Sequence, residues 1–145
     1  NPWTAPHDAA VYVLTEGLVA MGILSGKIEE LVDQEAYKPY YMHKTGHWIG
    51  LDVHDVGDYL IDKEPRILEA GMVLTVEPGL YFAPKTKGLD KKWWGIAVRI
   101  EDDILVTENG PINLSGEAPR TSKEIEKMMA KKSVLDEFVL PNIDK

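Results

Sequence analysis

A short apolar run near the middle of the chain constrains the fold more than any other feature of the sequence. Residues 72–76 lie between Gly71 and the pair Pro78-Gly79. A brief apolar run bounded by glycine and proline is typical of a strand buried inside a sheet. The sequence therefore predicts a buried strand at 72–76, with Glu77 at its end.

Two helices are predicted before this strand. Residues 8–24 carry apolar side chains at helical spacing, and two glycines stand where such a helix would stop. A second, short helix fits residues 27–36. Pro39 then requires an extended path, and residues 40–55, rich in aromatic and β-branched side chains, are predicted to form a strand with irregular turns.

The remainder of the chain alternates strands and turns, and it ends in a helix. Helices followed by antiparallel strands indicate an α+β fold, here a single domain over residues 1–145. The predicted elements are a strand at 80–83, a loop at 84–95, one long strand at 96–107, a hairpin turn at 108–110, an amphipathic helix at 121–131, and a loosely held tail from Ser133.

Charge and composition exclude several classes of function. The net charge of −8 argues against a nucleic-acid partner and against docking on anionic lipid. No apolar stretch is long enough to span a membrane. The absence of cysteine excludes disulfides and thiolate zinc sites, and it favours a cytoplasmic location. The chain opens at Asn1 without a signal-peptide pattern or an initiator Met, so we expect a piece of a longer product.

Histidines cluster in one short segment. His43, His47 and His54 lie within twelve positions, interleaved with glycine. Histidine is the commonest metal ligand and the usual general acid or base near neutral pH. A single histidine is more often an ordinary surface or core residue, but three together favour a site. His7 stands apart, and we expect it to be a solvated surface residue.

Two carboxylates end predicted strands. Glu77 follows the buried run, where a charge is costly unless it is paired or metal-bound, although it could also reach solvent from the strand end. Alternation places Arg99 and Glu101 on one face of the later strand. That face is equally consistent with a solvated surface and with a metal-ligand carboxylate beside a cationic neighbour.

Imidazole and carboxylate groups together suit Mn, Fe, Co or Zn ions. Two close metal ions can activate a shared water and hydrolyse an amide without a Ser or Cys nucleophile. The sequence contains no Cys, no Gly-x-Ser-x-Gly nucleophile elbow and no phosphate-binding glycine loop, which fits this chemistry.

Three segments in this order resemble one protein family. Residues 43–55, 71–81 and 95–107 are similar to the aminopeptidase P branch of the pita-bread metallopeptidases, which also include prolidase and methionine aminopeptidase. Gly-His-Trp followed by Leu-Asp-Val-His-Asp points to this branch, and the likeness extends from about Gly17 to about Met129. The resemblance implies a pita-bread fold, of which this chain would be the C-terminal half.

The resemblance also implies roles in a site with two metal ions. His47 matches a ligand of one metal, Glu77 a ligand that also handles the proton of the attacking water, and Glu101 the carboxylate that bridges both metals. The family usually uses two Mn²⁺ ions per complete site, with Co²⁺ or Zn²⁺ as alternatives.

Three further residues match groups around the metals. His43 and His54 match histidines that orient substrate and stabilise the tetrahedral intermediate, and Arg99 matches an arginine beside the bridging carboxylate. The implied activity is release of the N-terminal residue from peptides with proline at the second position. The implied parent protein is a homo-oligomer.

The chain departs from the family pattern at two points. Lys44 stands where the family has glycine. The family's two ligand aspartates would fall before residue 1, and the surroundings of Asp8 do not match their motif. We therefore expect three of the five ligands, and a chain that is inactive alone. Prolidase activity on dipeptides, a non-catalytic peptide-binding or protein-binding module, and a half-domain that pairs with another chain are the alternatives.

Overall fold

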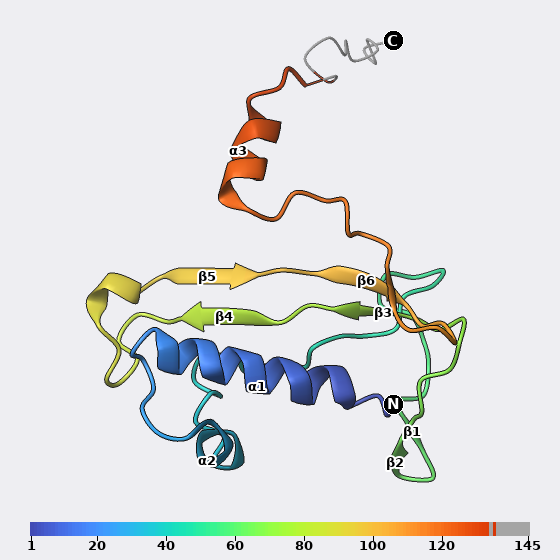
Figure 1. Ribbon diagram of the computed structural model, residues 1–145, viewed down its shortest axis with the longest axis horizontal. Helices are drawn as coiled ribbons and strands as arrows, with labels where there is room; N and C mark the ends of the chain where they lie inside the picture. Colours follow the sequence, from blue (N-terminus) through green and yellow to red (C-terminus); the bar gives the residue numbers. More distant parts are fainter. Residues whose placement is uncertain (134, 136–145) are drawn as a thin grey trace, which may run out of the picture.

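The computed structural model describes residues 1–133 and 135 (Figure 1). The tail predicted to be loose from Ser133 therefore lies almost entirely outside the described residues. None of the helices in the described part of the chain is long and apolar enough to cross a membrane.

Two helices precede the strands, as predicted, but with different bounds. α1 (Ala5–Ala20) begins earlier than predicted because Pro6 fits the first helical turn. It ends before Gly22, which adopts a left-handed conformation with φ +71°. α2 (Ile28–Asp33) is shorter than predicted, and the left-handed Glu35 (φ +54°) follows its end.

The strands are short, and each pair is antiparallel. β3 and β4 confirm the strands predicted at 72–76 and 80–83, and the predicted loop at 84–95 contains one 3₁₀ turn (Lys91–Trp93). The sheets have the orders β1-β2, β3-β6-β7 and β4-β5. The strands are β1 (Leu60–Ile61), β2 (Glu64–Pro65), β3 (Val73–Val76), β4 (Gly79–Phe82), β5 (Ile96–Arg99), β6 (Asp102–Leu105) and β7 (Ile112–Asn113).

The prediction of one long strand at 96–107 is wrong. Ile100 and Glu101 separate β5 from β6, which pair with β4 and β3 respectively and lie nearly in line in Figure 1. The physical reason lies on the opposite strand. Pro78 has no N–H to donate to the ladder, so the regular pairing is interrupted, and the Ile100 N–H donates to the Pro78 carbonyl at 3.3 Å across the break.

The prediction of a strand over 40–55 is also wrong, except for a short central part. Residues 45–49 run along the free edge of β3, with one isolated bridge between Trp48 and Leu74. After Gly50 the chain folds back on itself, because the Asp55 carboxylate accepts the Leu51 N–H at 3.0 Å. Residues 40–55 thus form no regular strand, and the part that follows β3 is this edge segment, residues 45–49.

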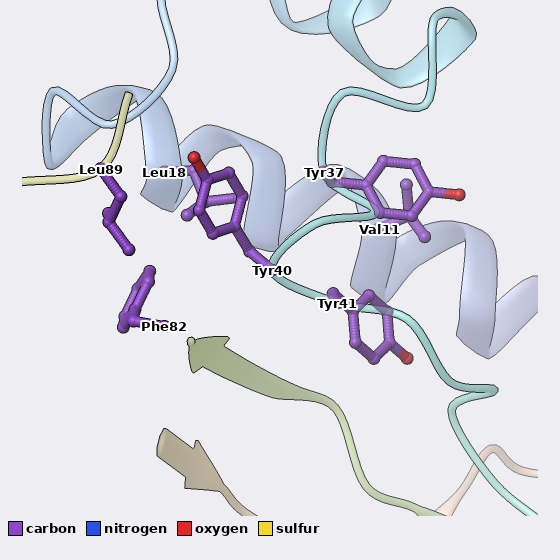
Figure 2. Packing of buried hydrophobic residues seen from close by; sticks show 7 residues of the cluster. All are labelled: Val11, Leu18, Tyr37, Tyr40, Tyr41, Phe82 and Leu89. Atoms are coloured by element: carbon purple, nitrogen blue, oxygen red, sulfur yellow. The ribbon is translucent and has the colours of Figure 1, made fainter. Parts of the chain in front are cut away.

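The core lies between α1 and the end of β4 (Figure 2). Tyrosines from the segment after α2 fill the space between the helix and the strand, and the Tyr81 N–H donates to the Tyr40 carbonyl at 2.9 Å. β5, by contrast, is exposed at all four positions. The buried cluster comprises Val11, Leu18, Tyr37, Tyr40, Tyr41, Phe82 and Leu89.

The last elements agree with prediction. The turn at 108–110 joins β6 to β7, and the Gly110 N–H donates to the Thr107 carbonyl at 3.2 Å. α3 (Ser122–Met129) begins at a capping box in which Thr121 and Glu124 satisfy each other's backbone N–H groups. Arg120, just before this helix, pairs with Asp102 at the start of β6.

Replacing Leu18 should test the core. Leu18 is 0% exposed, so L18A removes buried methyl groups and should lower the free energy of unfolding by about 2–5 kcal/mol. Val13, on the same helix, is 61% exposed, and V13A should change it by about 0.5 kcal/mol or less. Denaturant titration of both variants measures the contrast, and equal losses would contradict this packing.

Asp102 should make stability depend on acid pH. Burial raises the pKa of its carboxyl, but hydrogen bonds from Ser115 and Arg120 outweigh burial and hold that pKa below its ordinary value. A depressed folded-state pKa contributes stability above the unfolded value, about 3.9, and this contribution is lost as pH falls through the folded-state pKa.

Denaturation at several pH values should therefore show a higher free energy of unfolding for wild type than for D102N. This difference should be largest near neutral pH and should decrease below about pH 4. The exposed Glu108 offers a control, because E108Q should leave the pH profile unchanged. A D102N difference that stays constant down to pH 2 would refute the assignment.

Candidate metal centre

Three donors predicted from the sequence lie together in the structure. One ligand atom each of His47, Glu77 and Glu101 lies within 4.8 Å of the other two. His47 comes from the edge segment, Glu77 from the end of β3, and Glu101 from the break between β5 and β6. Neighbouring extended segments thus each supply one donor.

Strand register places the two carboxylates opposite each other. Val76 pairs with Asp102 on one side of the interruption, and Gly79 pairs with Arg99 on the other. Because the register is the same on both sides, Glu77 faces Glu101 across the gap. The break in the ladder therefore leaves the alignment of the two carboxylates intact.

The hydrogen bonds of His47 define which nitrogen is free. Its Nδ1 lies 2.8 Å from the Trp48 carbonyl oxygen, which can only accept, so Nδ1 carries the proton. Nε2 is then the nitrogen directed to the cluster, 3.3 Å from Glu77 Oε1. A histidine that donates from one nitrogen to a carbonyl is oriented to bind a metal through the other.

Glu77 is the buried member of the cluster, with 8% of its surface exposed. This burial argues against the alternative that its carboxylate reaches solvent. Oε2 accepts from Arg99 Nη1 at 2.9 Å, and Oε1 accepts from the Thr75 hydroxyl at 3.1 Å. The Glu77 N–H donates to the Thr45 carbonyl at 2.7 Å, so both its main chain and its side chain are held.

The donor set fits a divalent cation. One imidazole and two carboxylates offer nitrogen and oxygen ligands of the kind that Mn, Fe, Co and Zn ions accept. Glu101 is exposed, so the cluster is open on its side. Further ligands can therefore approach from that direction.

A hydrogen-bonded chain next to the cluster links Arg99 to His43. Arg99 Nε donates to the Tyr81 hydroxyl at 2.6 Å, and this bond is the main reason that the pKa of Arg99 is raised. The Tyr81 hydroxyl lies 2.9 Å from His43 Nε2, while His43 Nδ1 lies 2.7 Å from the Lys44 carbonyl. The sequence patterns did not single out Tyr81, although strand alternation places it on the same face of β4 as Gly79.

The remaining candidates lie at the edge of the cluster. The exposed ring of His54 stands edge-on to the ring of His47, with centroids 4.3 Å apart. Lys44, the residue that departs from the family pattern, is exposed. The structure thus places His54 against His47 and Arg99 against Glu77, while His43 is linked to Arg99 through Tyr81.

The expectation that His7 is a solvated surface residue is wrong. His7 is half-buried, and its Nδ1 lies 2.8 Å from the Thr45 hydroxyl. Burial lowers the pKa of His7, and the positive charge of Lys44 lowers it further. His7 precedes Val11 by one helical turn on the buried face of α1, a signal that was hidden because the predicted helix began at residue 8.

Comparison with known proteins shows the family to which the chain belongs. The model of metallopeptidase family M24 matches residues 4–108. The chain is 51% identical over 119 residues to Xaa-Pro aminopeptidase of Escherichia coli (strain K12), covering 82% of this chain and 26% of that protein. Against the Haemophilus influenzae Xaa-Pro aminopeptidase the identity is 48% over 123 residues, covering 85% and 28%.

A solved structure has the same architecture. Pseudomonas aeruginosa aminopeptidase PepP superposes with a TM-score of 0.83 at 53% identity, covering 89% of this chain and 29% of that one. The chain therefore spans between 26% and 29% of the length of these relatives.

Cation titration should test the donor cluster. We expect the purified chain to bind one Mn²⁺ weakly, because three donors are an incomplete set. H47A and E101Q should each abolish this binding, measured by electron paramagnetic resonance of free Mn²⁺. E108Q, which removes an exposed carboxylate from the turn before β7, should leave it unchanged. Tight binding of two ions, or equal binding by H47A, would contradict the assignment.

Proposed function

Since the chain belongs to metallopeptidase family M24, we propose that it is part of the catalytic domain of an aminopeptidase that releases the N-terminal residue from Xaa-Pro peptides. The observation that carries the proposal is the convergence of His47, Glu77 and Glu101 within 4.8 Å in a chain 51% identical to a Xaa-Pro aminopeptidase. The predicted α+β pita-bread fold is confirmed by the likeness to PepP.

The chain would supply the C-terminal portion of the domain. On this proposal its three donors are three of five ligands, and two aspartates come from residues of a longer polypeptide. The chain covers 26–29% of the length of its relatives, which is consistent with this arrangement. The parent protein would be a homo-oligomer, and its cytoplasmic location stays a prediction.

The complete site would hold two divalent cations, with Mn²⁺ proposed as the native ion and Co²⁺ or Zn²⁺ as alternatives. When bound, such a pair activates water and polarises the peptide carbonyl. His47 Nε2 and the carboxylates of Glu77 and Glu101 would hold them. The nitrogen and oxygen donors and the absence of cysteine fit these ions.

The chain's own residues would position substrate and move the proton. Glu77 is buried, and a carboxylate in that setting can take up a proton from water and return it to the leaving amine. Arg99 holds Glu77 Oε2 at 2.9 Å and fixes the orientation of its carboxylate. His54 flanks the cluster, where an imidazole could orient the peptide and stabilise the tetrahedral intermediate. The family resemblance implies the same kind of role for His43, whose ring is held by the Lys44 carbonyl and the Tyr81 hydroxyl.

Two alternatives are distinguished by activity. A prolidase would use the same ligands but cleave only Xaa-Pro dipeptides. A non-catalytic module would bind peptide or protein without metal chemistry. The presence of all three donors in one cluster favours an enzyme over this module.

A chimera should test the activity. Residues 4–108 would replace the matched segment of the Escherichia coli Xaa-Pro aminopeptidase, which supplies the rest of the domain. We expect the chimera to release the first residue of a Xaa-Pro-Pro peptide with Mn²⁺, and the E77Q chimera to lose at least about a thousandfold in kcat.

Three outcomes would contradict the proposal. Cleavage of Xaa-Pro dipeptides alone would favour prolidase. A folded, metal-loaded chimera without hydrolysis would favour the binding module. Detectable cleavage by the isolated 145-residue chain would overturn its assignment as an inactive portion.

A further inference from the structure

We propose that Thr75 is a positioning residue whose hydroxyl locks two candidate ligands, His47 and Glu77, into one fixed unit. The inference rests on the proposed function, because it concerns the same donor cluster. It adds a residue that none of the sequence patterns singled out.

The Thr75 hydroxyl bonds to both ligands. Its Oγ1 accepts from the His47 main-chain N–H at 3.0 Å and donates to Glu77 Oε1 at 3.1 Å. Thr75 is 1% exposed, so water cannot readily replace either partner. One buried oxygen therefore connects the backbone of one ligand to the side chain of the other.

The direction of this bridge is fixed. A main-chain N–H can only donate, so the hydroxyl accepts from His47, and its single proton is free for Glu77. A hydrogen bond to an ionised carboxylate is about twice as strong as one between neutral groups. The bridge therefore holds Oε1 of the Glu77 carboxylate at a fixed position relative to the His47 main chain.

Close backbone contact holds the bridge in place. The Thr75 N–H donates to the His47 carbonyl at 3.0 Å, so the two residues are bonded twice. A Cβ on Gly46 would lie 1.9 Å from the Thr75 carbonyl oxygen, so only glycine permits this approach. Since β-branched side chains are stiff at χ1, Thr75 has little freedom to turn away.

Without the Thr75 hydroxyl, the Glu77 carboxylate would lose one of its two side-chain hydrogen-bond donors. Arg99 would then be the main donor to Glu77, through Oε2 at the more exposed side of the cluster. The carboxylate would be free to rotate toward Arg99 and away from His47 Nε2, now 3.3 Å from Oε1. The distance between the two ligands would no longer be set.

The test compares T75V, which keeps the shape but loses the hydroxyl, with T75S, which restores it. Thr15 offers a matched control, because it is 0% exposed and its hydroxyl donates only to the Val11 carbonyl in α1, at 2.7 Å. Two readouts are made on the 145-residue chain: Mn²⁺ affinity, and hydrogen exchange of the His47 amide in metal-free protein.

We expect T75V to weaken Mn²⁺ binding roughly 10–100-fold, the usual cost of removing a group that orients a metal ligand. Exchange of the His47 amide should accelerate at least tenfold in T75V. T75S should return both values to within about threefold of wild type. T15V should leave both unchanged, whatever it does to thermal stability.

The outcomes separate this inference from the proposed function. If wild type binds Mn²⁺ and T75V binds equally well, the positioning role is wrong and the metal centre stands. If T15V weakens binding as much as T75V does, the effect is general stability, which also overturns the inference. If wild type binds no Mn²⁺, the metal centre fails, and unchanged His47 amide exchange in T75V would overturn the bridge as well.

Discussion

The site depends on one close contact between backbones, that of Gly46 with the carbonyl of Thr75. A side chain at Gly46 would overlap that carbonyl, so the edge segment could not lie against β3. With glycine there, the Thr75 N–H bonds the His47 carbonyl and the Glu77 N–H bonds the Thr45 carbonyl. These bonds place His47 beside Thr75, near the end of β3. The donor cluster is thus a result of main-chain geometry before any side chain is considered.

The interruption at Pro78 complements this contact. Proline removes one ladder bond where β3 passes into β4, and Ile100 and Glu101 form the corresponding break between β5 and β6. Because the register continues across the interruption, Glu77 stays opposite Glu101.

Local sequence signals account for the elements that were predicted correctly. Gly71 and Pro78 bound β3, and Thr121 with Glu124 forms the cap of α3, so neighbouring residues alone define these ends. The break at Glu101 was missed because its cause, Pro78, lies on the partner strand. Residues 40–55 carry strand-forming side chains, but Asp55 folds the chain back by accepting the Leu51 N–H, a loop contact that strand-forming composition does not reveal.

The candidate site shows the same division. The residue types of His47, Glu77 and Glu101, together with the family resemblance, pointed to a metal centre, and the structure brings their donor atoms within 4.8 Å. The supporting groups could not be predicted in this way. Thr75 and Tyr81 are ordinary strand residues in the sequence, and only pairing in three dimensions places their hydroxyls against ligands and neighbours.

The shared register of the paired strands also determines where the chain can change in length. The loop over residues 84–95 joins β4 to β5 at the end away from the carboxylates, and the ladder between these strands fixes the alignment whatever the loop contains. Insertions or deletions among its largely exposed residues, 84–88, should be tolerated, whereas Leu89 is held in the core. One residue gained or lost within β5 would turn Glu101 to the other face of the ribbon. The exposed part of the loop can therefore diversify during evolution while the strands beside the site keep their length.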